Sequence, residues 1–121
     1  MMGHWRTAVL LALVGAALCA CDGSANSPAD AQRARGKALL TSYGCVSCHS
    51  IKGLQAGAGA AGPPLEKIAD NSYIAGVLPN NQAALEQWIV APRRISPGTA
   101  MPELGVSPDE ARAMAVYLLH Q

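Results

Sequence analysis

The chain has 121 residues, a formal net charge of +1 and few aromatic side chains, with two Trp, three Tyr and no Phe. This length allows one domain at most, and the near-neutral charge excludes the basic footprint of a nucleic-acid-binding protein. A short chain with so few bulky side chains buries only a modest core of its own. A large apolar cofactor at its centre would therefore help to explain how it folds.

Residues 1–20 have the pattern of an export signal. The basic residue Arg6 precedes an apolar run over residues 7–18, which is too short for a membrane-spanning helix of about 20 residues. The following Leu18-Cys19-Ala20-Cys21 resembles the lipobox of bacterial lipoproteins, which implies that Cys21 becomes the lipidated first residue of the mature chain. The alternative is ordinary signal cleavage that leaves Cys21 free.

Residues 21–27 are small and polar, and we expect them to form a flexible tether between the lipid and a folded domain over residues 28–121. In enteric-type lipoproteins an Asp directly after the lipidated cysteine is typical of proteins held at the inner membrane, so by this resemblance Asp22 predicts the periplasmic face of that membrane. Loss of Arg6 with the signal leaves a formal charge of zero, so steering of partners by net charge is not expected.

The first helix is predicted over residues 28–43. Ser27 is its expected N-cap, with Pro28 in the first turn, and Gly44 can end the helix in a left-handed conformation. One face at helical spacing carries the residues expected to be buried. These are Gly36, Leu39, Leu40 and Tyr43.

The middle of the chain is predicted to be less regular. Residues 53–62 are mostly Gly and Ala without periodicity and indicate a loop, followed by a short helix over residues 65–69. Asn80 or Asn81 can cap a longer helix that runs to about Ala91, where Pro92 stops it. Its apolar face consists of Leu85, Trp88 and Ile89.

The last helix has the clearest start signal, because Ser107-Pro108-Asp109-Glu110 forms a capping box with Pro in the first turn. No segment alternates like a strand, so the predicted fold class is all-α. The apolar stripe of this helix consists of Ala111, Met114, Ala115 and Leu118, with Tyr117 beside it.

Cys45-Val46-Ser47-Cys48-His49 is a C-x-x-C-H motif, which is typical of c-type haem attachment. Two thiols three positions apart at a helix start can both reach the vinyl groups of one porphyrin. The next residue then lies beneath the iron, where the His49 imidazole can be the proximal ligand, provided that an acceptor holds its other N–H. The motif therefore predicts one covalently bound haem c.

The motif has three other interpretations. A structural zinc site needs four ligands, and only His120 remains as a fourth beside the motif. A thioredoxin-like redox pair needs a β-α-β context. A structural disulfide between Cys45 and Cys48 is possible in an oxidising compartment, but it leaves His49 without a role.

Met101 is the candidate for the sixth iron ligand, because it lies in an irregular segment between two predicted helices, where no helical pattern places it in a core. The alternative is a buried loop methionine beside a five-coordinate or bis-histidine iron. Met114 falls on the apolar stripe of the last helix and is expected to be core. His120, near the end of the chain, is expected to be a free surface residue.

From the first helix to residue 121, the chain resembles the class I cytochromes c. Gly62-Pro63-Pro64-Leu65 is similar to the family's Gly-Pro-x-Leu segment. The resemblance implies that the Pro63 carbonyl accepts the N–H of the proximal imidazole and that Leu65 packs on the haem. It also implies that Gly36 and Leu40 of the first helix pack against Tyr117 of the last.

Residues 85–101 (LEQWIVAPRRISPGTAM) are similar to a second stretch of that family, a helix followed by Pro, two basic residues, and Pro-Gly-Thr-x-Met. The resemblance implies that Met101 is the axial ligand, that Thr99 supports it, and that Arg93 and Arg94 belong to a basic rim, where they are either a docking patch or a solvated face. The family often has a Tyr where this chain has Trp88. An indole N–H only donates, so Trp88 is either a haem-side group near the Met101 sulfur or plain core.

The expected function is single-electron transfer at the periplasmic membrane face, since an iron with two protein ligands leaves no open position for a substrate. The expected partners are membrane-bound: a quinol-oxidising complex and a terminal oxidase, with no nucleic acid. Two alternatives stay open. One is a haem-bearing subunit of a terminal oxidase or dehydrogenase complex, and the other is a haem-based sensor or peroxidase-like enzyme, which needs a labile or absent sixth ligand.

Overall fold

A computed structural model describes residues 27–55, 57 and 61–121. The predicted signal over residues 1–20 and the lipidation site Cys21 lie outside these residues, as does the tether apart from Ser27. None of the helices among the described residues is long and apolar enough to cross a membrane.

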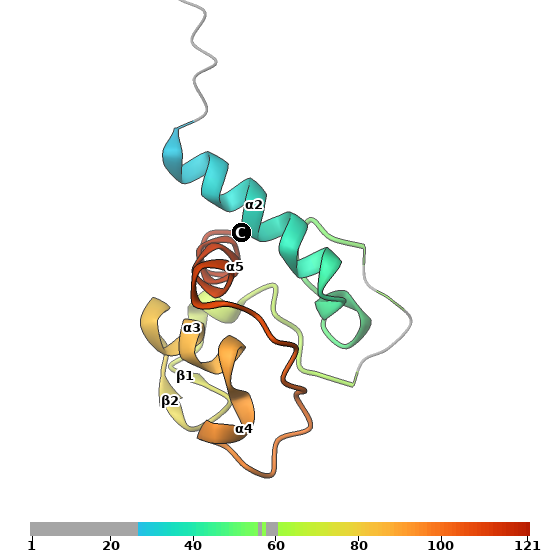
Figure 1. Ribbon diagram of the computed structural model, residues 1–121, viewed down its shortest axis with the longest axis vertical. Coiled ribbons are helices and arrows are strands. Elements are labelled where there is room, and N and C mark those ends of the chain that lie inside the picture. The colour runs from blue at the N-terminus through green and yellow to red at the C-terminus, as the bar shows by residue number, and fades with distance from the viewer. Residues whose placement is uncertain (1–26, 56, 58–60) are drawn as a thin grey trace, which may run out of the picture.

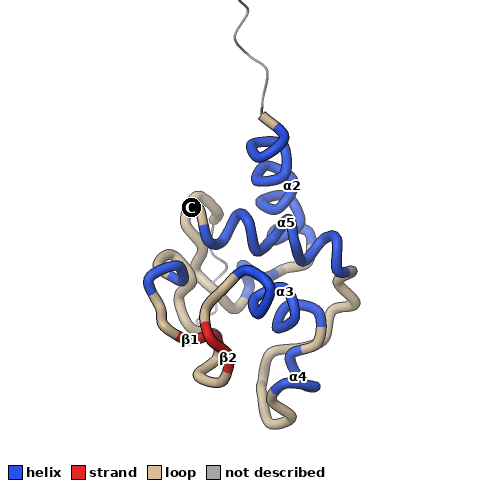
Figure 2. The backbone as a smooth tube through the Cα atoms, turned by 90° about the vertical axis from the view of Figure 1, so that its left-hand side faces the viewer, coloured by secondary structure: helices blue, strands red, loops and turns tan. Residues whose placement is uncertain are grey.

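The described chain folds as helices joined by long loops, with one small hairpin (Figures 1 and 2). Helix α2 crosses α5, and α3 packs against α5, so that α5 lies at the centre of the helical part (Figure 1). The elements in chain order are α2 (Pro28–Ser42), a 3-10 turn (Cys45–Ser47), a second 3-10 turn (Ile68–Asp70), β1 (Tyr73–Ile74), β2 (Leu78–Pro79), α3 (Gln82–Val90), α4 (Pro92–Ile95) and α5 (Pro108–Leu119).

Helix α2 begins and ends where the sequence predicts, within one residue. The Ser27 side chain accepts the backbone N–H of Asp30, whose carboxylate in turn accepts the backbone N–H of Ser27, so the capping box is complete. The helix ends at Ser42, with Tyr43 as its C-cap, and Gly44 turns the chain with φ of +72°. Of the four residues predicted to be buried, Gly36 and Leu40 are buried, whereas Leu39 and Tyr43 are partly buried and pack against the core.

The helix predicted from Asn80 or Asn81 to about Ala91 is confirmed as α3, whereas the short helix α4 that follows it was not predicted. The Asn81 side chain caps α3 by accepting the N–H of Ala84, and the helix ends at Val90 with Ala91 as its C-cap. Pro92 does more than stop α3, because it also opens the four-residue helix α4. Proline suits the first position of a helix, where an N–H has no partner within the helix.

The expectation that no strand forms is wrong for four residues. Strands β1 and β2 pair antiparallel, with Tyr73 opposite Pro79 and Ile74 opposite Leu78. Ala75 and Gly76 turn the hairpin with φ of +52° and +72°, values typical of a tight hairpin turn. Two-residue strands are too short to show alternation, and Ala75 is not the Asn or Asp that usually announces such a turn. Similarly, the helix expected over residues 65–69 is a 3-10 turn at Ile68–Asp70.

The core lies along α5, whose apolar stripe is buried as predicted. Met114 is fully buried, and Leu85 of α3 is 2 % exposed. Helix α2 approaches α5 so closely that a Cβ on Gly36 would lie 2.0 Å from the Ala113 carbonyl oxygen and 3.1 Å from the Cβ of Tyr117. This confirms the expected contact of Gly36 with Tyr117 and shows that the backbone of Ala113 sets the distance between the helices.

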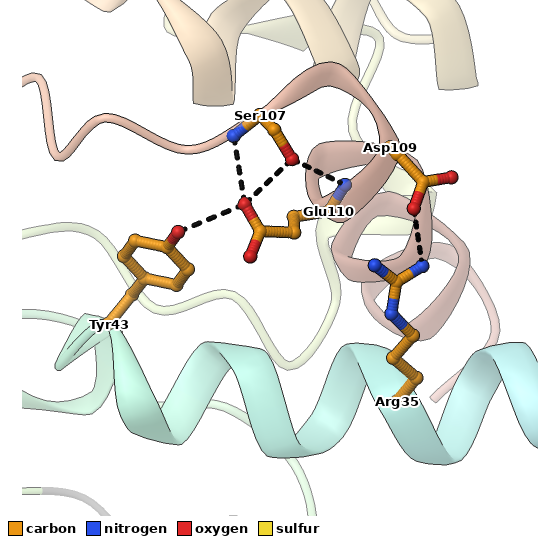
Figure 3. Close-up of polar contacts among 5 residues, drawn as sticks. All are labelled: Arg35, Tyr43, Ser107, Asp109 and Glu110. Atoms are coloured by element: carbon orange, nitrogen blue, oxygen red, sulfur yellow. Dashed lines mark hydrogen bonds and ion pairs between the residues drawn. The ribbon is translucent and has the colours of Figure 1, made fainter.

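Polar contacts lock the same crossing from outside (Figure 3). The Tyr43 hydroxyl, at the end of α2, donates to the Glu110 carboxylate over 3.0 Å, and the same oxygen accepts the Ser107 backbone N–H over 3.0 Å. Arg35 pairs with Asp109 at 2.7 Å, but both side chains are exposed, so this ion pair contributes little. The capping box of α5 therefore also ties α5 to α2.

Replacement of Gly36 by Ala tests the helix crossing. The added methyl overlaps the Ala113 carbonyl, and we expect a loss of about 1–3 kcal/mol in the free energy of unfolding, despite the gain of about 1 kcal/mol in helix propensity. Chemical denaturation of the haem-loaded protein measures this free energy of unfolding. Gly98→Ala is the matched control, because a Cβ there meets nothing within 4 Å. Equal stability of both variants would contradict the close approach.

Glu110→Gln tests the polar lock through its pH dependence. Hydrogen bonds from Ser107 and Tyr43 hold the pKa of Glu110 below its ordinary value of 4.5. A carboxylate with a lowered folded-state pKa stabilises the fold above its unfolded pKa and loses that contribution as the pH falls through the folded value. We therefore expect the variant to melt below the parent at neutral pH, with the difference narrowing below pH 4.5. The exposed Glu103→Gln is the control, and a pH-independent difference would count against the lock.

Candidate functional site

One cavity of about 440 Å³ lies beside α5, between α3, the hairpin and the loops before and after them. This volume falls within the range of cofactor pockets, which are mostly apolar with a few placed polar groups. All eight residues of the folded domain that the sequence assigns to the cofactor line this cavity. They are Cys45, Cys48, His49, Pro63, Leu65, Trp88, Thr99 and Met101.

The Cys45–Ser47 turn brings both thiols to the cavity. Gly44 enters the turn in the left-handed conformation, and the Cys45 carbonyl accepts the N–H groups of Cys48 and His49 over 3.2 and 3.0 Å. The sulfur atoms of Cys45 and Cys48 are not joined in a disulfide. Burial raises the pKa of the Cys45 thiol. The group therefore stays protonated in the folded chain before any haem is attached.

The His49 imidazole is held in one orientation by the chain that follows it. Its Nδ1 lies 2.7 Å from the Pro63 carbonyl oxygen. A carbonyl oxygen only accepts, so Nδ1 carries the proton and Nε2 keeps a lone pair for a metal. The Pro63 role that the resemblance implies is therefore present in the geometry, and it supplies the acceptor that a ligand histidine needs.

Gly62 permits this arrangement. Its N–H donates to the Cys48 carbonyl over 2.8 Å, and a Cβ at this position would lie 2.4 Å from Cε1 of the His49 ring. Any side chain at residue 62 would therefore push the imidazole away from the Pro63 carbonyl. Glycine is required here by close approach to a ring and not by an unusual φ.

Met101 reaches the same cavity from the loop between α4 and α5. A turn closed by the Thr99 N–H to the Ser96 carbonyl over 3.0 Å shapes this loop, and the Thr99 hydroxyl then accepts the Met101 N–H over 3.2 Å. Thr99 thus fixes the backbone that carries the thioether. Trp88 lines the cavity from α3 and is 9 % exposed, so it is both core and cavity wall.

The geometry offers little support for a zinc site or a thioredoxin-like redox pair. Among the described residues, no group of three or more His, Cys, Asp or Glu side chains could hold a metal ion, and His120 is exposed at the end of α5. The described strands form one antiparallel hairpin, which differs from the β-α-β unit of a thioredoxin-like pair.

Sequence reasoning missed the part of the wall that the hairpin builds. Tyr73, Ile74 and Ala75 line the cavity, and Tyr73 is 61 % exposed there. Gly76 was a signal for this turn, but Ala75 before it is not the Asn or Asp that usually accompanies it. Met114, expected to be plain core, also lines the cavity while fully buried.

The residues present fit a covalently held haem. Two unlinked thiols, an imidazole with a free Nε2 and a thioether share one apolar cavity, and this donor set matches the ligands that proteins use for haem iron in cytochromes c. Imidazole and thioether together favour a high reduction potential.

Comparisons with known proteins also point to a cytochrome c domain. The family model described as Cytochrome c matches residues 33–121. The chain is 30 % identical over 92 residues to Cytochrome c oxidase subunit 2 of Alkalihalophilus pseudofirmus, an alignment that covers 75 % of this chain but only 26 % of that protein. The chain thus spans about a quarter of the length of this relative. No solved structure matches it.

A family match that runs from the first turns of α2 to residue 121, and so includes every residue that the sequence assigns to the cofactor, identifies the chain as a member of the cytochrome c family, whose domain binds covalently attached haem c and transfers electrons.

Proposed function

We propose that this protein is a mono-haem electron carrier at the periplasmic face of a bacterial membrane, with Cys45 and Cys48 as the thioether attachment points and His49 and Met101 as the axial ligands. The observation that carries the proposal is the convergence of these four side chains on one cavity from two segments far apart in the chain, the C-x-x-C-H motif and the loop that carries Met101. Haem supplies reversible exchange of one electron between ferric and ferrous iron.

The residues of the chain prepare both sides of the iron site. The Pro63 carbonyl keeps the His49 ring in the tautomer that presents Nε2, and Thr99 holds the Met101 backbone. Leu65, Ile74 and Trp88 line the cavity with apolar surface. Apolar walls exclude water and so favour the ferrous iron, which carries less charge.

With His49 and Met101 both bound to the haem iron, no coordination position would be left for a substrate. The function is therefore electron transfer, and the protein turns over no substrate of its own. Soft thioether sulfur stabilises ferrous iron and raises the reduction potential, which suits an acceptor of electrons from a quinol-oxidising complex.

A lipid on Cys21 would keep the domain within reach of membrane-bound partners. Tethering raises the effective concentration of two partners on one surface without any new contact between them. A quinol-oxidising complex as donor and a terminal oxidase as acceptor fit this placement.

A second candidate is a haem-bearing subunit of an oxidase complex. The similarity to a protein named as an oxidase subunit favours it, since 75 % of this chain aligns with part of that subunit. Purification in mild detergent separates the two candidates: a shuttle elutes alone, and a subunit elutes with a complex.

Met101→Ala tests the axial ligand. Loss of the thioether removes the weak red absorption band of a methionine–iron bond in the oxidised protein, lowers the reduction potential, and opens the ferrous iron to carbon monoxide. Optical titration measures all three. Met114→Leu is the matched control, because Met114 lines the same cavity and this swap conserves volume. A parent protein that already binds carbon monoxide strongly would favour the sensor or peroxidase-like alternative.

Cys21→Ser tests the anchor. We expect this variant, expressed from the full chain, to lose the lipid label and to be either released from the membrane or retained with its signal uncleaved, with its haem spectrum unchanged where it matures. Cys19→Ser is the matched control, because Cys19 leaves with the signal and its change should keep the protein in the membrane fraction. Fractionation of the cell envelope with labelling by radioactive palmitate distinguishes the outcomes. Unlabelled parent protein in the soluble periplasmic fraction would overturn the tether.

A further inference from the structure

Two segments of the chain run side by side around the His49–Pro63 contact, and we call residues 48–52 and 62–65 together the proximal clamp. The Gly62 N–H donates to the Cys48 carbonyl, and the Leu65 N–H donates to the Ser50 carbonyl, each over 2.8 Å. The hydrogen bond between His49 and Pro63 lies between these two rungs in sequence. The geometry of the imidazole therefore depends on how firmly the two segments are held together.

The clamp has few donors of its own on the Pro63 side. Residues 63 and 64 are both proline, and proline has no backbone N–H. The position of the Pro63 carbonyl is consequently fixed by its neighbours, Gly62 before it and Leu65 after it.

The side chain of Gln121 joins the two segments where their backbone pairing stops. Its Oε1 accepts the Lys52 N–H over 2.9 Å, and its Nε2 donates to the Leu65 carbonyl and, over 3.1 Å, to the Leu118 carbonyl. A primary amide has acceptor and donor in one plane, as a peptide group does. Gln121 thus supplies a further rung, built from a side chain, between Lys52 and Leu65.

The end of α5 also holds the second backbone group of Lys52. The Tyr117 hydroxyl donates to the Lys52 carbonyl over 2.7 Å. Gly53 makes this possible, because it has a φ of +76° and a Cβ there would lie 2.8 Å from the Tyr117 hydroxyl. Leu118 is 2 % exposed, so the last turn of α5 is packed into the core. The proximal clamp is therefore attached to a buried part of the fold.

We propose that Gln121 is a positioning residue for the haem ligand: by tying Leu65 to Lys52 and to α5, it keeps the Pro63 carbonyl against Nδ1 of His49 and so tunes the reduction potential. This inference rests on the proposed role of His49. A well-aligned N–H to carbonyl hydrogen bond makes an imidazole a stronger donor to its metal, which stabilises ferric iron. Loosening the clamp therefore raises the potential.

Gln121→Leu and Gln121→Glu test the proposal in the haem-loaded full chain. Leucine removes both bonds of the side-chain rung. Glutamate retains an acceptor for the Lys52 N–H but faces the Leu65 carbonyl with a second acceptor oxygen, so the two repel. We expect both variants to have a higher reduction potential, so that the ferrous to ferric ratio at a fixed electrode potential rises at least about twofold. We expect the glutamate variant to have the larger effect.

A second readout reports the hydrogen bond itself. Exchange of the His49 Nδ1 proton with solvent, followed by NMR in the reduced protein, should become at least about tenfold faster in both variants. His120→Ala is the matched control, because His120 is exposed at the same helix end, and it should leave both readouts unchanged. Tyr117→Phe removes one bond to Lys52 but spares Leu65, so it should lower stability with a smaller shift in potential.

The inference would be overturned if both Gln121 variants kept the reduction potential and the proton exchange rate of the parent protein. This holds even if the variants unfold more easily, because that pattern marks a purely structural contact. Failure of the proposed function is distinct. It would appear in the parent protein as missing covalent haem or as an iron that lacks His49.

Discussion

The hydrogen bond between Nδ1 of His49 and the Pro63 carbonyl is the constraint on which the rest of the site depends. It fixes the tautomer, and the tautomer decides which nitrogen can bind a metal. The bond also explains residues that have no chemistry of their own. Gly62 is needed because any side chain would occupy the space of the ring, and the consecutive prolines of the same loop leave its placement to the residues beside them.

The helix crossing supplies the frame for this contact. Gly36 lets α2 approach the backbone of Ala113, and the Tyr43–Glu110 hydrogen bond fixes the other end of the crossing. Helix α5 then takes part in the core and the cavity at once, because Met114 is fully buried and also lines the cavity. A small core that shares its walls with the cofactor cavity links folding to haem binding, which is the link that the composition first indicated.

Much of this structure could be predicted from the sequence, because its strongest signals are local. The capping boxes at Ser27 and Ser107 and the Asn81 cap place three helix starts correctly. The C-x-x-C-H motif is a local chemical requirement, and the resemblance to the class I cytochromes c connects it to Pro63 and Met101, which lie far along the chain. The structure adds that these residues meet in one cavity.

The features that were missed depend on tertiary contacts or on very short elements. Helix α4 and the β1–β2 hairpin are too short to show a period, and Ala75 adopts a positive φ at a cost of about 1–2 kcal/mol that no propensity scale anticipates. Gln121 could not be found from sequence, because its partners Lys52 and Leu65 are brought to it only by the packing of α5. The lipid anchor at Cys21 stays a prediction.

Mass spectrometry of the polypeptide after native maturation is the most direct test of the central claim. The account predicts one added haem, located by proteolysis on the peptide that contains Cys45, Cys48 and His49. An unmodified peptide with two free thiols would contradict it, since neither the His49 geometry nor the position of Met101 would then serve electron transfer.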